Sequence, residues 1–356
     1  FQNCMRESIE GAQESLQIAY KEMNGWLSTS KDTRPIEDVL IGAYRTNALS
    51  MFHISAQIDS KDISSRTILT IEEATPFTGH ISIYGAFESF HVDDLLSGRL
   101  DKHWLNSLLF NAGLELAKDL GMRADERMRR ALAHAILLDY KITRCSPQFA
   151  AQTSKPEQWR TTLGELELYD SMFDFRFFLG SYLGRDIPAD TEVVIAPGRD
   201  YFMRMMAVLQ EYSAQEGQQI IRDYIKFKQL FMLTIHSGKL VRSRDLGGLE
   251  TLRILYTGED DRSLQCINRV GMVNQLGFVS ILEKFWGTKL RENMEKARSI
   301  GEDMRREYID ALRKSDVIDE KDRFAMIDKT ERVRIRVAVP EASRDPVAQE
   351  SEYKMV

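Results

Sequence analysis

Apolar residues recur at helical spacing over long stretches of this chain, and this pattern constrains the fold more than any other sequence feature. One stretch carries apolar side chains three or four positions apart, at Leu105, Leu108, Leu109, Ala112, Leu116 and Leu120. A second stretch, from Asp125 to Tyr140, repeats an apolar residue every four positions. Each places its apolar side chains on one face of a helix, and Gly121 lies between them as a helix end. The two stretches therefore predict a helical hairpin.

The same periodicity extends over most of the remaining chain. It predicts further helices near residues 2–23, 36–48, 199–213, 216–236, 267–285, 289–313 and 319–337. Because candidate strands are few, we expect a predominantly α fold. The hydrophobic fraction of 43% in 356 residues is enough to fill a sizeable core. The chain is therefore expected to be folded and globular.

Three short segments have the character of strands. Met51 to Ile58 and Arg66 to Ile71 carry β-branched residues in alternation, and the polar turn DSKDISS separates them. They predict a small β-hairpin. A third strand is expected at 192–195, where the turn Pro197-Gly198 follows. The sequence shows no internal repeat and no low-complexity tract.

The charge balance and the hydropathy exclude two classes of partner. The formal net charge is −6, so the chain does not attract a phosphate backbone by bulk electrostatics and we expect no nucleic-acid partner. No apolar run approaches the ~20 residues of a membrane-spanning helix. The start also lacks the basic, apolar and small-residue succession of a signal peptide. We therefore expect that the chain as given neither spans a membrane nor carries a targeting segment.

The three cysteines, Cys4, Cys145 and Cys266, leave two interpretations open. They are too few for a disulfide framework and too scattered for a structural zinc site. One long-range pair with one remaining thiol is possible, as in a secreted protein. Three reduced, buried thiols in a cytosolic protein are the other interpretation, and the absence of an Asn-x-Ser/Thr sequon slightly favours it.

The histidines are the first candidates for catalysis or metal binding, and there are six: His53, His80, His91, His103, His134 and His236. None belongs to a His-Glu-x-x-His motif, in which two imidazoles one helical turn apart hold zinc. We interpret them as surface or capping residues. The glycines at 247–248 lack the lysine of a phosphate-binding loop. Ser28 and Lys31 match Ser-x-x-Lys, but the partner motifs of a serine acyltransferase are missing.

Other polar and aromatic clusters also have structural explanations. The run from Arg123 to Arg130 interleaves acids and bases at the start of a helix, which is typical of a solvent face with i,i+4 pairs. The adjacent carboxylates of Glu72 and Glu73 point in different directions. The aromatic segment Phe173–Gly184 could line a ligand groove, although core is the more common role. We therefore predict no catalytic, cofactor-binding or metal-ligating residue in this chain.

Several segments, read in order, resemble one known family. Phe1-Gln2-Asn3-Cys4-Met5 is similar to an aromatic-x-x-Cys-Met/Leu element at the start of a helix, and Asn24-Gly25-Trp26-Leu27 stands where that family has Gly-Gly-Trp-Pro. Near the other end, Cys266 precedes Asn274-Gln275-Leu276-Gly277-Phe278, and Val317-Ile318-Asp319-Glu320 stands where the family has Trp-Met-Asp. Lys329 and Val339-Pro340 then follow, with Ala338-Val339 in place of Gly-Tyr. This collinear series resembles the N-terminal part of the ectodomain of the neprilysin family of zinc metallopeptidases.

The resemblance implies a fold and a disulfide. Residues 1–340 would form the helical lobe that caps the family's active site, incomplete at both ends. The polar, non-periodic segment 341–356 would be a tail without a packed position. In this family the cysteine after the aromatic residue pairs with the one before the Leu-Gly-Phe helix, here Cys4 with Cys266. Cys145 would remain reduced or form an intermolecular bond.

The resemblance also implies a function. The family's zinc ligands and general base, in His-Glu-x-x-His and a later Glu-x-x-x-Asp, are absent from this sequence. Zinc would then belong to the complete family enzyme, and this chain alone would be inactive. Its partners would be the missing catalytic lobe of the same polypeptide and small peptides as substrates, with an extracellular or plasma-membrane ectodomain location. The alternatives are a non-catalytic extracellular interaction module and an unrelated cytosolic helical scaffold.

Overall fold

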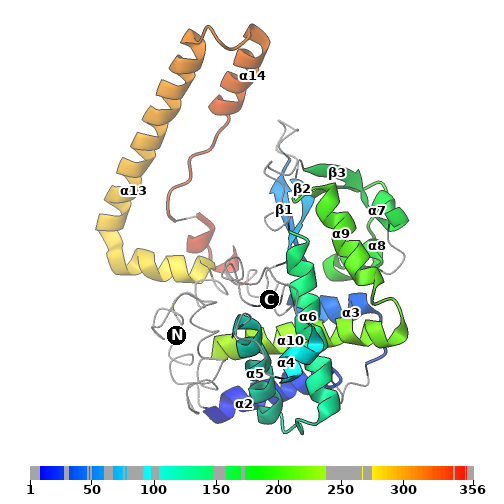
Figure 1. Cartoon of the computed structure of the whole chain (residues 1–356). Coiled ribbons are helices and arrows are strands. Elements are labelled where there is room, and N and C mark those ends of the chain that lie inside the picture. Colours follow the sequence, from blue (N-terminus) through cyan, green and yellow to red (C-terminus); the bar gives the residue numbers. More distant parts are fainter. Residues whose placement is uncertain are drawn as a thin grey trace. The chain divides into compact units, whose positions relative to one another are not determined.

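The computed structural model of the chain describes two compact units (Figure 1). It describes residues 9–27, 32–45, 48, 50–59, 67–74, 77, 91–97, 104–146, 158–169, 173–237, 267, 275–339, 341–348 and 350. The larger unit is Arg6–Asp260, and the smaller one combines Phe1–Met5 with Asp261–Val356. Both units are mainly helical in the described residues, which confirms the predominantly α fold class.

The described helices of the larger unit are α2 (Ile9–Glu22), α3 (Ile36–Arg45), α4 (Val92–Ser97), α5 (Trp104–Asp119), α6 (Glu126–Arg144), α7 (Leu163–Tyr169), α8 (Phe175–Leu183), α9 (Arg199–Gln210) and α10 (Gln215–Ser237). The short helices α4, α7 and α8 were not predicted, and the others follow the predicted apolar periods. The predicted hairpin is formed by α5 and α6, which contact each other. Asp125 begins α6 as its N-cap, because its side chain accepts a hydrogen bond of 2.8 Å from the N–H of Met128.

A small mixed sheet lies in the larger unit. Its strands are β1 (Phe52–Ile58), β2 (Thr67–Glu73), β3 (Trp159–Thr162) and β4 (Glu192–Ile195), in the order β1-β2-β4-β3. The predicted hairpin is confirmed, since β1 and β2 pair antiparallel from Phe52↔Glu73 to Ile58↔Thr67. The predicted strand at 192–195 is also confirmed, and it pairs in parallel with β2. β3 was not predicted, and it pairs antiparallel with β4.

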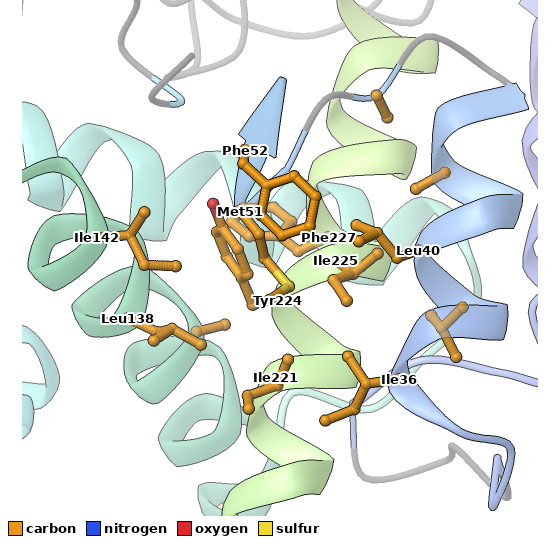
Figure 2. Close-up of a cluster of buried hydrophobic side chains, with 14 of the residues drawn as sticks. Ile36, Leu40, Met51, Phe52, Leu138, Ile142, Ile221, Tyr224, Ile225 and Phe227 are labelled. Carbon is orange, nitrogen blue, oxygen red and sulfur yellow. The ribbon is translucent and has the colours of Figure 1, made fainter. Parts of the chain in front are cut away.

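The core of the larger unit forms around α10, which contacts α2, α3, α5 and α6 (Figure 1). Figure 2 shows side chains of four elements meeting there: Ile36 and Leu40 of α3, Met51 and Phe52 at the start of β1, Leu138 and Ile142 of α6, and Ile221, Tyr224, Ile225 and Phe227 of α10. Gly113 allows α5 to pack closely, because a Cβ atom there would lie 2.8 Å from the side chain of Leu132 and 3.2 Å from that of Phe227, and Leu132 would have to move.

The smaller unit contains a long, kinked helix and a shorter helix that follows and contacts it. It comprises α13 (Gln275–Lys314), α14 (Glu320–Glu331) and the 3₁₀-helix η4 (Glu341–Arg344). The sequence predicted two helices, 267–285 and 289–313, whereas α13 continues through both. The predicted break survives as a kink, since Gly287 has φ 51° and ψ −126° inside α13. Only glycine adopts this backbone conformation without strain.

The start of the expected tail has a packed position at Ser343 and Arg344, where the prediction expected none. Ser343 in η4 is buried, and the neighbouring Arg344 is ion-paired with Glu283 of α13 at 2.7 Å. This pair could not be predicted, because the two residues are 61 positions apart and nothing in the local sequence links them. Among the described helices, none combines the length and apolar character that crossing a membrane requires.

Candidate functional site

The turn after α2 contacts α10, and Asp223 of α10 makes two of the hydrogen bonds between them. Trp26 is fully buried and stacks on Phe227 of α10, with ring centroids 5.3 Å apart. Its indole N–H donates to the carbonyl oxygen of Asp223 at 3.2 Å. The backbone N–H of Leu27 donates to the carboxylate of Asp223 at 2.9 Å. Asp223 therefore holds both the side chain and the main chain of this turn.

The backbone of the turn explains the two departures from the family sequence. Asn24 and Leu27 have φ values of 58° and 49°. Asparagine tolerates this left-handed region better than most residues, so Asn24 can stand in place of glycine. Proline can adopt neither a positive φ nor the hydrogen bond from residue 27 to Asp223, because its ring fixes φ and it has no N–H. This turn geometry therefore excludes the family's proline at position 27.

A buried ion network surrounds the same turn. The ammonium of Lys226 lies 3.0 Å from the carboxylate of Asp32, and both side chains have 0% exposure. Lys226 also donates to the carbonyl oxygen of Gly25 at 3.1 Å. The guanidinium of Arg34 donates to both carboxylate oxygens of Asp32, at 2.9 and 2.6 Å. Segments far apart in sequence are therefore joined to α10 by charged hydrogen bonds.

Burial and pairing shift the pKa of each member of this network. Burial raises the pKa of Asp223 to about 6, although the positive charge of Lys226 opposes the shift. For Asp32, burial also acts upward, but the hydrogen bonds from Arg34 and Lys226 together hold its pKa well below the usual range. Burial lowers the pKa of Lys226, against the attraction of Asp32. The network is most favourable with Asp32 and Lys226 both ionised.

A second buried pair joins α6 to α10. The ammonium of Lys228 lies 3.9 Å from the carboxylate of Asp139, which accepts hydrogen bonds from the hydroxyl of Tyr224 at 3.1 Å and the N–H of Phe77 at 3.3 Å. Lys228 also lies 5.3 Å from the ring centroid of Phe77, within cation–π range. Burial lowers the pKa of Lys228 to about 8, and burial raises that of Asp139.

These buried charged groups have a structural role. A catalytic acid, base or nucleophile must lie within reach of a substrate, whereas these side chains are buried and paired with one another. In the part of the chain that the structure describes, no three or more His, Cys, Asp or Glu side chains gather to hold a metal ion. This network was not predicted from the sequence, although the charged residues Asp223, Lys226 and Lys228 within a largely apolar segment were a signal for it.

The cysteines are only partly described. Cys4 and Cys266 lie outside the described residues, so their pairing stays a prediction. Cys145 is free and buried at the end of α6, where its thiol donates to the carbonyl oxygen of Lys141 at 3.3 Å. Burial raises the pKa of Cys145 to about 11, so at neutral pH it is a protonated thiol of low reactivity.

The described histidines occupy separate places. His53 in β1 lies 3.1 Å from Glu72 in β2. His134 is half-buried on α6, and burial lowers its pKa. His91 precedes α4 and is exposed. His80, His103, the side chain of His236 and the Ser-x-x-Lys and Gly-Gly segments lie outside the described residues.

The basic run and the aromatic segment match their structural interpretations. On α6, Arg130 forms an exposed i,i+4 pair with Glu126. The aromatic segment forms α8, and Phe173, Phe175 and Phe178 are buried in the core. An open depression of about 940 Å³ borders α8 and the loop that follows it. Its lining contains both acidic and basic side chains, including Arg176, which is bound to the carbonyl oxygen of Ile187 at 3.2 Å.

The comparison with protein families decides the identity of the chain. The sequence model of peptidase family M13 matches residues 1–340. The chain belongs to peptidase family M13. This is the neprilysin family, so the resemblance drawn from the separate motifs is confirmed. No curated protein matches the sequence of this M13 chain.

A solved structure supports the family at the level of the fold. The zinc metalloprotease Zmp1 of Mycobacterium tuberculosis, solved by cryo-electron microscopy in an open state, superposes with a TM-score of 0.57 at 10% sequence identity. The match covers 99% of this M13 chain and 53% of the Zmp1 chain. This chain therefore spans about half the length of that solved relative.

Family membership implies zinc, and the described residues of this chain do not fit it. M13 enzymes use zinc, which proteins hold with histidine, cysteine or carboxylate side chains that converge on one point. The described residues of this chain show no such group. The buried carboxylates Asp32, Glu37, Asp59, Asp139 and Asp223 already accept hydrogen bonds from protein groups. No step of the peptidase reaction is therefore assigned to these residues.

Proposed function

We propose that this chain is the N-terminal, active-site-capping lobe of an M13 zinc endopeptidase that processes small peptides. The observation that carries the proposal is the match of family M13 to residues 1–340 in a chain whose described residues hold no metal-binding group. The zinc-dependent chemistry then belongs to another part of the same polypeptide. The contribution of this lobe is steric, because it limits the size of the peptide that reaches the catalytic centre.

The buried ion network supports such a steric role. A cap that selects by size must keep its shape, and paired buried charges favour one arrangement of their elements. Here the Asp32–Lys226 and Asp139–Lys228 pairs join the segment before α3 and helix α6 to α10. In the described part of the larger unit, ion pairs at Lys226 and Lys228 thus hold two other segments against α10.

We also propose a disulfide between Cys4 and Cys266 and an extracellular location for the polypeptide. Both rest on the resemblance, in which Cys4 and Cys266 stand where the family has its paired cysteines. Closing a loop this long would restrict the unfolded chain and stabilise the fold by roughly 5 kcal/mol in the entropy model. Peptide mapping of secreted protein without reductant tests the bond. A Cys4 peptide recovered with a free thiol would contradict it.

Enzyme assays of two polypeptides test the main proposal. The purified chain is incubated with zinc and a quenched, neuropeptide-sized fluorogenic substrate, and no hydrolysis is expected. A longer polypeptide that continues past residue 356 into a zinc-binding segment is expected to cleave the same peptide in a chelator-sensitive manner, and to leave a folded protein substrate intact. Zinc-dependent turnover by the 356-residue chain would refute the proposal. An inactive longer polypeptide would favour the non-catalytic interaction module.

A further inference from the structure

The two edges of the four-stranded sheet differ in their protection against pairing. Edge strands are usually short, charged, bulged or covered, because their free N–H and C=O groups can pair with another chain. At one edge, β3 has four residues and carries Arg160. The guanidinium of Arg160 donates to the carboxylate of Asp59 at 2.9 Å and lies 3.7 Å from Glu192. The edge at β3 is therefore short and charged.

The other edge, β1, lacks most of these protective features, although the hydroxyl of Tyr44 in α3 covers its start by donating to the carbonyl oxygen of Phe52. It has seven residues, FHISAQI, without lysine, arginine or proline. Its register with β2 runs without a bulge from Phe52↔Glu73 to Ile58↔Thr67. Within the described part of the sheet, β2 is the only strand paired with β1. The last three residues of β1 are exposed, and Ile58 has 73% exposure.

The side chains of β1 present two different faces to a neighbouring strand. One face is polar: the carboxylate of Glu72 in β2 lies 3.1 Å from His53, and it accepts hydrogen bonds from Ser55 at 3.2 Å and Gln57 at 2.8 Å. Side chains alternate along a strand, so Ile54, Ala56 and Ile58 lie on the opposite, apolar face. An added strand would place its alternate residues beside these same two faces.

We propose that the outer edge of β1 binds an extended peptide segment through main-chain hydrogen bonds. The peptide alternates apolar residues, beside Ala56 and Ile58, with basic residues beside Gln57, on the face of the sheet where Glu72 of β2 supplies a negative charge. This is addition of a strand to a sheet edge, in which the main chain supplies affinity and alternate side chains supply specificity. The inference goes beyond the proposed function, because it holds whether or not the complete polypeptide hydrolyses peptides.

The surroundings of β1 favour a free peptide over a second copy of the chain. Phe52 at the start of β1 is buried, and its ring centroid lies 5.9 Å from that of Phe178 of α8 and 6.4 Å from that of Tyr44 of α3. Only the end of β1, residues 56–58, is exposed. A second copy would have to bring its own helices close to this short exposed segment, whereas a peptide carries no such bulk.

Binding of a defined peptide tests the proposal. The probe is a fluorescein-labelled octapeptide of alternating lysine and valine, titrated into the purified chain and followed by anisotropy. We expect saturable binding below about 1 mM. Hydrogen exchange of the backbone amides in residues 52–58 should slow by about tenfold when the peptide is bound. A peptide with N-methyl groups on alternate amides, which cannot pair, should bind at least about tenfold more weakly.

A protein variant and its matched control complete the test. Ile58→Lys combined with Ala56→Lys places two positive charges at the exposed end of β1, and should weaken binding of the basic peptide by about tenfold. Leu168→Lys changes a residue of α7 with 84% exposure and should leave binding unchanged. Circular dichroism verifies that both proteins are folded.

Four outcomes would overturn the proposal. These are no binding up to about 1 mM, binding without slower exchange in residues 52–58, equal binding of the N-methylated peptide, or equal loss of affinity in the Leu168→Lys control. Slower exchange in residues 52–58 that depends on protein concentration and not on peptide would show that a second copy occupies this edge.

Discussion

Lys226 and Asp32 form an ion pair of 3.0 Å from which solvent is excluded on both sides. The pair joins the middle of α10 to a segment of the chain that precedes α3. Removing water from two charges costs free energy, and hydrogen bonds to further groups offset that cost. Arg34 supplies them to Asp32, and the carbonyl oxygen of Gly25 accepts one from Lys226. The pair is therefore more useful for fixing the position of this segment than for adding stability.

We predict that Lys226→Met lowers the free energy of unfolding by about 3–5 kcal/mol, because it leaves the Asp32 carboxylate buried and lacking one of its partners. Urea unfolding monitored by circular dichroism measures the loss. The double variant Lys226→Met, Asp32→Leu should recover much of it. Arg298→Ala, which breaks an exposed pair with Glu295, should cost no more than about 1 kcal/mol. A single variant as stable as this control would contradict the role given to the pair.

Restoring the family's proline in the turn after α2 should be harmful. Leu27→Pro demands a negative φ where the backbone has φ 49°, and it removes the N–H that donates to Asp223. We expect it to destabilise the protein by roughly 3 kcal/mol more than Leu27→Ala, which also loses the buried side chain but keeps the N–H. Thermal unfolding of the two variants compares them. Equal stability would mean that the turn adopts another conformation.

The dependence of the free energy of unfolding on pH in mild acid should report the titration of Asp223. Its pKa is raised to about 6 by burial, above the ~4 of an unfolded chain. The folded state therefore binds more protons between about pH 4 and pH 6, and the contribution of this group to stability falls as the pH rises through that window. Asp223→Asn should flatten the curve of unfolding free energy against pH there, by on the order of 3 kcal/mol. Parallel curves for variant and wild type would show that Asp223 titrates normally.

At alkaline pH the free energy of unfolding should instead rise with pH, because of Lys228. Burial lowers the pKa of Lys228 to about 8, below the ~10.4 of an unfolded chain. The unfolded state binds more protons between these values, so this group makes the protein more stable as the pH rises from about 8 to 10. Lys228→Met should abolish that rise. The measurement is the denaturant midpoint across this pH range. Lys284→Met, at an exposed position of α13, is the control and should keep the rise.

Cys145 should differ from Cys4 and Cys266 in how it reacts with a thiol reagent. Because Cys145 is buried and its pKa is raised to about 11, we expect it to react with iodoacetamide at pH 8 at least about a hundredfold more slowly in the folded chain than in urea. If Cys4 and Cys266 are bonded, unfolding without reductant exposes one reactive thiol per chain, and reduction exposes three. Mass spectrometry counts the labels. Rapid labelling of Cys145 in the native protein would be inconsistent with its buried position.

Much of the local structure could be predicted from the sequence, because it follows from local patterns. The helical hairpin α5–α6 and the β1–β2 hairpin each bury one face that is periodic within a single stretch. The gap between the helices predicted at 267–285 and 289–313 also contains Gly287, where α13 is kinked. α13 nevertheless continues on both sides of it, and the sequence predicted two separate helices.

The rest depends on residues far apart in the chain. β3 has four residues, and its place beside β4 is set by the sheet rather than by the pattern of its own side chains. The charges of α10 are buried because their partners arrive from elsewhere: Asp32 is paired with Lys226, and Asp139 with Lys228. An amphipathic pattern would assign such lysines to solvent. Pairings of this kind become visible only with the fold.

The parallel pairing of β2 with β4 has a consequence for the order of folding. Leu69 pairs with Val193, so a ribosome must add more than a hundred residues after β2 before its second neighbour exists. Throughout that interval the nascent β1–β2 hairpin has two open sides instead of one. Contacts so distant in sequence slow folding and lengthen exposure to aggregation. Newly made chain is therefore most dependent on chaperones while the segment between these strands is still being synthesised.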